Sequence, residues 1–96
     1  NIFLYLLSIK YIMNPVNTRD EVEKASKKAT ESLYGTEIQD FKIRELFALP
    51  EKGPQDAWDV QVTFLLNKLK HTVDLVIQQK DGHITNARLI DTMVPL

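Results

Sequence analysis

The chain has 96 residues, of which 44% are hydrophobic and 26% are charged, with a formal net charge of −1 and no cysteine. These proportions are those of one globular domain, and without cysteine there can be no disulfide, thiolate nucleophile or cysteine-bound metal. Because acidic and basic residues nearly balance, no overall positive field attracts nucleic acid or an anionic membrane, and we expect neither as a partner.

Residues 1–13, NIFLYLLSIKYIM, are strongly apolar and contain no acidic side chain. About 20 apolar residues are needed to cross a membrane, so this segment is too short to span one. It also lacks the basic start and the small-residue cleavage site of a secretory signal. Three interpretations stay open: sequence upstream of the domain proper, an extra element packed on the core, and an interfacial anchor. A single domain is expected over residues 14–96, and the absence of cysteine is compatible with a cytoplasmic location.

A helix of about sixteen residues is predicted before Gly35, a residue that readily adopts the left-handed conformation found at helix ends. Its start is marked by Thr18 and Glu21, whose spacing lets each side chain cap a free backbone N–H of the first turn. Four apolar residues recur at helical spacing and predict a narrow buried stripe: Val22, Ala25, Ala29 and Leu33. The small alanines at the centre of this stripe favour close packing of the helix on a sheet.

After the helix, the hydrophobic period changes to two, which is the period of a strand. Residues 37–47 predict a half-buried strand, because Phe41 and Ile43 alternate with charged residues and Phe47 continues the same period. Residues 49–56 contain two prolines and a glycine, which indicate a loop.

The strongest alternation of apolar and polar residues lies in two neighbouring segments, 58–66 and 71–77. Between them, Asn67 and Lys68 fit a two-residue hairpin turn. The two segments therefore predict a pair of antiparallel strands.

The register of the last strand depends on the turn at Gly82. If Gly82 is the left-handed residue of a three-residue loop, Leu75 lies opposite Ala87 and the core stays apolar. A slip by one residue would turn Arg88 toward the core, so we predict the first register. That register also places Asp74 opposite Arg88 on the outer face, which is a favourable cross-strand pair.

These elements predict an α+β fold in which one N-terminal helix packs on a four-stranded antiparallel meander. The face toward the helix carries Trp58, Val60, Val62, Phe64, Val73, Leu75, Ile77, Ala87 and Leu89. The outer face is largely polar but includes four aliphatic residues: Leu65, Val76, Ile84 and Ile90. Such a patch predicts a binding surface for a protein partner or for a second copy of the chain.

The sequence contains no motif for catalysis or metal binding. His71 and His83 are expected roughly 26 Å apart, at about 3.3 Å per strand residue, and cannot share a metal ion. The G-x-S-x-G pattern, phosphate-binding loops and EF-hand spacings do not occur. We therefore expect no enzyme activity, no catalytic residue, no metal site and no cofactor.

Part of the pattern is shared with known small modules. The residues concerned are Ala25, Ala29, Leu33, Gly35, Glu37 and Ile38, then Trp58, Val60 and Val62, and finally Asp81 and Gly82 before the last strand. In this order they resemble the gas vesicle synthesis protein O family over residues 20–91, and the outline of the fold resembles PepSY-type modules and cystatins. The resemblance implies an accessory protein that contacts other proteins and has no catalytic residues.

The sequence thus predicts a non-catalytic interaction or assembly module, comparable to a gas vesicle accessory protein, that binds its partner through the outer face of the sheet. The alternative is a small-ligand-binding domain. Its pocket would lie between the helix and the sheet and would be lined by Trp58, Phe47 and Pro50.

Overall fold

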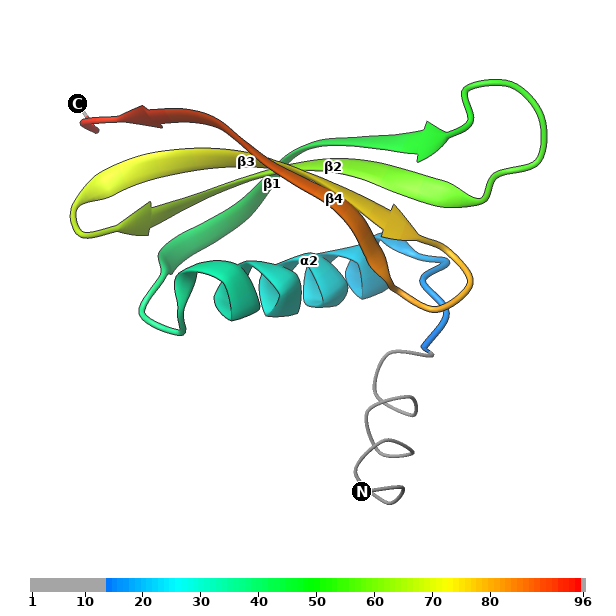
Figure 1. Cartoon of the computed structure of the whole chain (residues 1–96), viewed down its shortest axis with the longest axis horizontal. Helices are drawn as coiled ribbons and strands as arrows, with labels where there is room; N and C mark the ends of the chain where they lie inside the picture. The colour runs from blue at the N-terminus through cyan, green and yellow to red at the C-terminus, as the bar shows by residue number, and fades with distance from the viewer. Residues whose placement is uncertain (1–13, 96) are drawn as a thin grey trace, which may run out of the picture.

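The computed structural model describes residues 14–95 (Figure 1). Its elements are α2 (Arg19–Tyr34), β1 (Gln39–Leu49), β2 (Ala57–Leu66), β3 (Leu69–Gln78) and β4 (Ile84–Met93). The strands form one antiparallel sheet in chain order, and α2 packs on one of its faces. The predicted α+β fold is confirmed. The three interpretations of residues 1–13 fall outside the described residues.

The ends of α2 are those that the sequence predicts. Thr18 Oγ1 accepts a hydrogen bond from the backbone N–H of Glu21 at 3.2 Å, and Glu21 Oε1 accepts one from the N–H of Thr18 at 3.0 Å. These two bonds satisfy donors that the first turn of a helix leaves free. At the other end, Gly35 has a φ of 98° and donates its N–H to the carbonyl oxygen of Glu31 at 2.8 Å. Glycine adopts this φ without steric cost, and the helix ends there.

The buried side of α2 differs from the predicted stripe. Val22, Ser26 and Thr30 are completely buried, whereas Leu33 is 56% exposed. The hydroxyl of Ser26 donates to the carbonyl oxygen of Val22 at 2.6 Å, and that of Thr30 donates to Ser26 at 2.8 Å. Because both hydroxyls are satisfied within the helix, these small side chains can face the sheet at little cost. The prediction that Leu33 belongs to the buried stripe is wrong.

The core lies between α2 and the central strands β2 and β3. Its buried residues are Val16, Val22, Val60, Val62, Phe64, Val73, Leu75 and Ile77. Val16 precedes the helix and is fixed to the sheet through its backbone, because its C=O accepts a hydrogen bond from Trp58 Nε1 and its N–H donates to Gln79, both at 2.8 Å. These bonds hold the start of the domain against the sheet.

The strand pairings follow the predicted meander. The β2–β3 hairpin turns at Asn67 and Lys68, whose φ angles of 52° and 67° are those of a two-residue turn that matches the twist of the strands. In the middle of β3 and β4, Asp74 lies opposite Arg88, as predicted. The centre of the sheet therefore has the register that keeps apolar residues on the α2 side.

Candidate functional site

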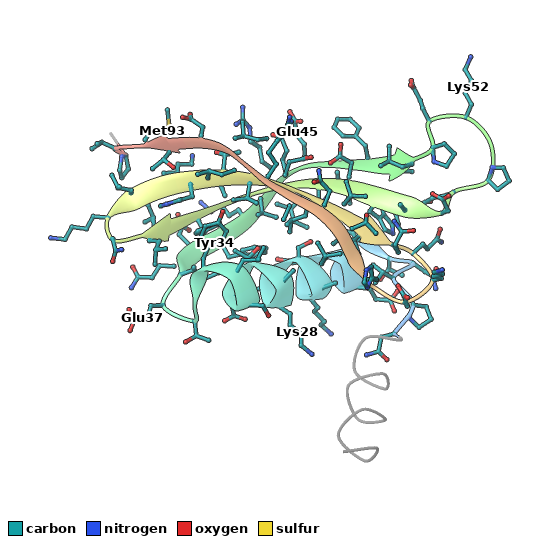
Figure 2. All side chains as sticks on the ribbon, in the orientation of Figure 1. Lys28, Tyr34, Glu37, Glu45, Lys52 and Met93 are labelled. Atoms are coloured by element: carbon teal, nitrogen blue, oxygen red, sulfur yellow. The ribbon has the colours of Figure 1, made fainter. Side chains whose placement is uncertain are left out.

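The outer face of the sheet is the side away from α2, where Figure 2 shows Glu45. Side chains on this face form rows that cross the strands. Leu65 lies opposite Lys70, whereas Val76 lies opposite Asp59, nearer the other end of the sheet. Two polar pairs of β2 and β3 lie between these positions: Thr63 with Thr72, and Gln61 with Asp74. Leu65 and Val76 therefore do not form one continuous apolar patch.

The predicted position of Ile84 on the outer face is wrong. Ile84 pairs with Ile77 and packs against the core on the α2 side. The loop before β4 contains residues 79–82 rather than three residues, because the N–H of Gln78 donates to the carbonyl oxygen of His83 at 2.7 Å. Further along β4 the register shifts by one residue, because Ile77 pairs with Ile84 whereas Val76 pairs with Asn86. Such a bulge moves a side chain to the opposite face, which alternation alone does not reveal.

Ile90 occupies a second irregularity of β4. Val73 pairs with Leu89 and Thr72 pairs with Asp91, which leaves Ile90 as the extra residue of a bulge. Its side chain is 43% exposed. The four residues of the predicted outer patch are thus not brought together, and Ile90 belongs to a separate surface formed by β4.

β4 is the most exposed strand of the sheet. All residues from Thr85 to Met93 are exposed, because α2 packs on the central strands β2 and β3. Three of the exposed side chains are large and apolar: Leu89 at 49%, Ile90 at 43% and Met93 at 50%. Apolar area of this kind along an edge strand is typical of a protein-binding surface.

The two edge strands differ in the charges that they carry. β1 has four charged side chains, at Asp40, Lys42, Arg44 and Glu45, whereas the ten residues of β4 include two, Arg88 and Asp91. Bulges also protect an edge strand from pairing, but both strands have register irregularities. The two edges therefore differ in their charges and not in their bulges. Charges on an edge strand discourage the addition of another strand. β4 is therefore the edge that is more open to pairing.

Two carboxyl groups meet near the centre of the outer face. Asp59 and Asp74 are diagonal neighbours on β2 and β3, Asp74 is 9% exposed, and Asp59 Oδ1 is buried without a hydrogen-bond partner. Burial raises the pKa of Asp74 to about 6, and two effects of Asp59 act in the same direction: its negative charge, and its ability to accept a hydrogen bond from the protonated form of Asp74. Arg88 opposes this rise and Glu45 adds to it. A proton on Asp74 would satisfy the buried oxygen of Asp59.

The residues of the predicted ligand pocket do not share a pocket. Trp58 lies on the α2 side, where its Nε1 donates to the carbonyl oxygen of Val16. Phe47 lies on the outer face and is 57% exposed, because Arg44 is an extra residue in β1 and reverses the alternation after it. Pro50 is exposed in the loop between β1 and β2. The prediction that these three residues line one pocket is wrong.

A hollow of about 500 Å³ lies instead beside α2, where residues 14–16 and the β3–β4 loop approach the helix. Its apolar residues include Val16, Ala25, Ala29 and Ile84, and its charged residues are Glu21, Lys24, Lys28 and Asp81. The α2 hollow could not be predicted from an alternation that places Ile84 on the other face. Gly82 lines the hollow, and a Cβ there would come within 3.2 Å of the carbonyl oxygen of Asn14.

The two histidines lie at opposite ends of β3. His71 stacks on Phe64 with the ring centroids 5.2 Å apart, and Tyr34, seen between helix and sheet in Figure 2, lies 5.0 Å from Phe64. The Nδ1 atom of His71 is 3.1 Å from the carbonyl oxygen of Leu69. His83 is exposed beyond the opposite end of β3. Among residues 14–95, no group of three or more histidine and acidic side chains could hold a metal ion.

Comparison with protein-family models, with curated proteins and with solved structures gives no match for this chain. The resemblance to the gas vesicle synthesis protein O family therefore stays a prediction. Within the part of the chain that the structure describes, no helix is long and apolar enough to cross a membrane.

Proposed function

We propose that this chain is a non-catalytic interaction module that binds another protein chain through β4. The observation that supports this most directly is the exposure of Thr85–Met93, which includes three large apolar side chains. A partner strand added at this edge would satisfy backbone groups and cover apolar surface in one step. An accessory role of this kind agrees with the resemblance to gas vesicle accessory proteins, and a cytoplasmic location is part of the proposal.

Binding through β4 replaces the outer patch of the sequence analysis with a different surface. Ile90 belongs to both, whereas Leu65 and Val76 are half-buried within the sheet and Ile84 packs toward α2. The proposal also agrees with the difference between the edges, because β1 carries four of the charges that keep an edge strand unpaired and β4 carries two.

Site-specific photo-crosslinking in the cells that make the protein tests this proposal. The photoreactive residue p-benzoylphenylalanine is placed at Leu89 on β4, at Leu33 on α2 or at Phe47 on β1. These positions are matched, since the native side chains are 49%, 56% and 57% exposed. We expect a protein adduct from position 89 and little from the other two. Equal adducts at all three positions, or none at position 89, would contradict the proposal.

A second candidate function is supported by the α2 hollow, whose volume lies within the range of small-molecule sites. Trp58 would report a ligand there, because Val16 both lines the α2 hollow and accepts the indole hydrogen bond. A screen of small metabolites by tryptophan fluorescence tests this function. Saturable changes that are lost when Ala29 is replaced by leucine, which fills the hollow, would support ligand binding over protein binding.

A further inference from the structure

The direction of the backbone groups in β4 shows what a partner strand can bind. Along an antiparallel strand, the N–H and C=O groups of successive residues point alternately to the two neighbours. Gln78 donates its N–H toward β4, so Asp74 and Thr72 of β3 also direct their backbone groups to that side. Their partners, Arg88 and Asp91, therefore use their own backbone groups within the sheet.

The backbone groups of β4 that point outward include those of Ala87 and Thr92, which flank Arg88 and Asp91 on either side. Ala87 lies opposite Leu75, and Thr92 lies opposite His71, and both of those β3 residues direct their backbone groups to β2. Ala87 and Thr92 thus present N–H and C=O groups at the open edge. In a regular strand, the backbone groups of Ala87 and Thr92 would point to opposite neighbours, because the two residues are an odd number of positions apart. The extra residue of the bulge at Ile90 directs both sets of groups to the open edge.

We propose that the partner strand is β4 of a second copy of this chain, paired antiparallel so that Ala87 of each copy lies opposite Thr92 of the other. This inference rests on the proposed function of β4. A two-fold axis then passes between Leu89 and Ile90, and the two four-stranded sheets join into one sheet of eight strands with both α2 helices on the same face.

Charge complementarity selects this register. With Ala87 opposite Thr92, Arg88 of each copy lies opposite Asp91 of the other, and both side chains are on the outer face because they pair with Asp74 and Thr72. These are the only two charged residues of β4, and the two-fold axis generates two Arg88–Asp91 pairs. The same register places Leu89 next to Ile90 of the second copy, so two of the three exposed apolar residues of β4 meet at the axis.

Disulfide trapping tests the register directly, because the native chain contains no cysteine. Asn86 and Met93 lie opposite one another across the proposed interface, again on the outer face. A mixture of the Asn86→Cys and Met93→Cys proteins should form a mixed disulfide under mild oxidation. Either protein alone should not, because identical positions would be about 20 Å or more apart along the strands. A mixture of Asn86→Cys with Phe47→Cys is the matched control.

Light scattering of the native chain measures the association itself. We expect a dimer that Asp91→Arg weakens by about tenfold or more, because two ion pairs become two repulsions. The variant Glu51→Arg, with the same change of charge in an exposed loop, should leave the dimer unchanged. Thr92→Pro should also abolish the dimer while the fold is kept, since it removes an N–H that β3 does not use.

Failure of this inference can be told apart from failure of the proposed function. A native chain that stays monomeric at all concentrations, or a dimer in which the mixed disulfide does not exceed the control, would overturn the pairing of two copies. If position 89 still crosslinks to a different protein, β4 remains the binding strand and the partner is that protein. If position 89 gives no adduct, the proposed function fails as well.

Discussion

Replacement of Asp74 by asparagine should stabilise the folded protein at neutral pH. Asp74 is 9% exposed and lies beside Asp59, whose Oδ1 atom is buried without a hydrogen-bond partner. Asparagine has nearly the same shape, carries no charge, and can donate an amide N–H to that oxygen. The substitution therefore removes a buried negative charge and supplies a missing hydrogen bond together.

The size of the effect follows from the pKa of Asp74, which burial and Asp59 raise from the ordinary value of 3.8 to about 6. A carboxyl group with a raised pKa binds its proton more tightly in the folded state. Its contribution to stability is therefore complete below pH 3.8 and is lost as the pH rises through about 6. The loss at neutral pH amounts to about 3 kcal/mol of unfolding free energy, and Asp74→Asn should recover about 1 to 3 kcal/mol of it.

The assay is urea-induced unfolding followed by circular dichroism from pH 4 to pH 8, at low protein concentration so that association does not contribute. The advantage of Asp74→Asn should be small at the acid end, should grow between the ordinary pKa of 3.8 and the folded-state pKa of about 6, and should be constant at higher pH. Glu51→Gln removes a carboxylate from an exposed loop and serves as the control. An Asp74→Asn protein that is less stable than the native chain at pH 7, or whose advantage does not change with pH, would refute the reasoning.

Three further substitutions test local features of the fold, each by its unfolding free energy in urea. Gly82→Ala should lower the unfolding free energy by about 1 kcal/mol more than Gly53→Ala does. Both glycines have a positive φ, but a Cβ at position 82 would also come within 3.3 Å of Val16. Equal losses would contradict this close approach. Trp58→Phe should cost about 1 to 2 kcal/mol through loss of the hydrogen bond to Val16, monitored by circular dichroism, and a neutral result would mean that water replaces the indole. Thr18→Ala should cost about 1 kcal/mol by removing the cap of α2, which an unchanged midpoint would contradict.

Features that depend on neighbouring residues could be predicted from the sequence. Thr18 with Glu21 fixes the start of α2 and Gly35 its end, because capping and left-handed backbone are properties of a few consecutive residues. The alternation in β2 and β3 and the turn at Asn67 likewise predict a hairpin without reference to the rest of the chain. Since one face of the sheet must be apolar, the pairing at the centre of β3 and β4 could also be predicted.

The candidate site could not be predicted, because its geometry depends on bulges in the edge strands. The extra residues at Arg44 and Ile90, and the shift that follows Ile84, change which side of the sheet a residue occupies. A bulge costs little in an edge strand and leaves no clear mark in hydrophobic alternation, so its position is set by the twist of the whole sheet. For this reason Phe47 and Ile84 are on the opposite faces from those predicted.

The sequence by itself therefore determined the α+β class, the helix ends, the central hairpin and the absence of cysteine chemistry, since each follows from composition or local backbone preference. The tertiary structure decided which side chains meet. It buries Ser26 and Thr30 and exposes Leu33, because the closest packing of α2 on the sheet favours small side chains. It also places α2 over the central strands and leaves β4 uncovered, and no local pattern encodes where one element lies on another.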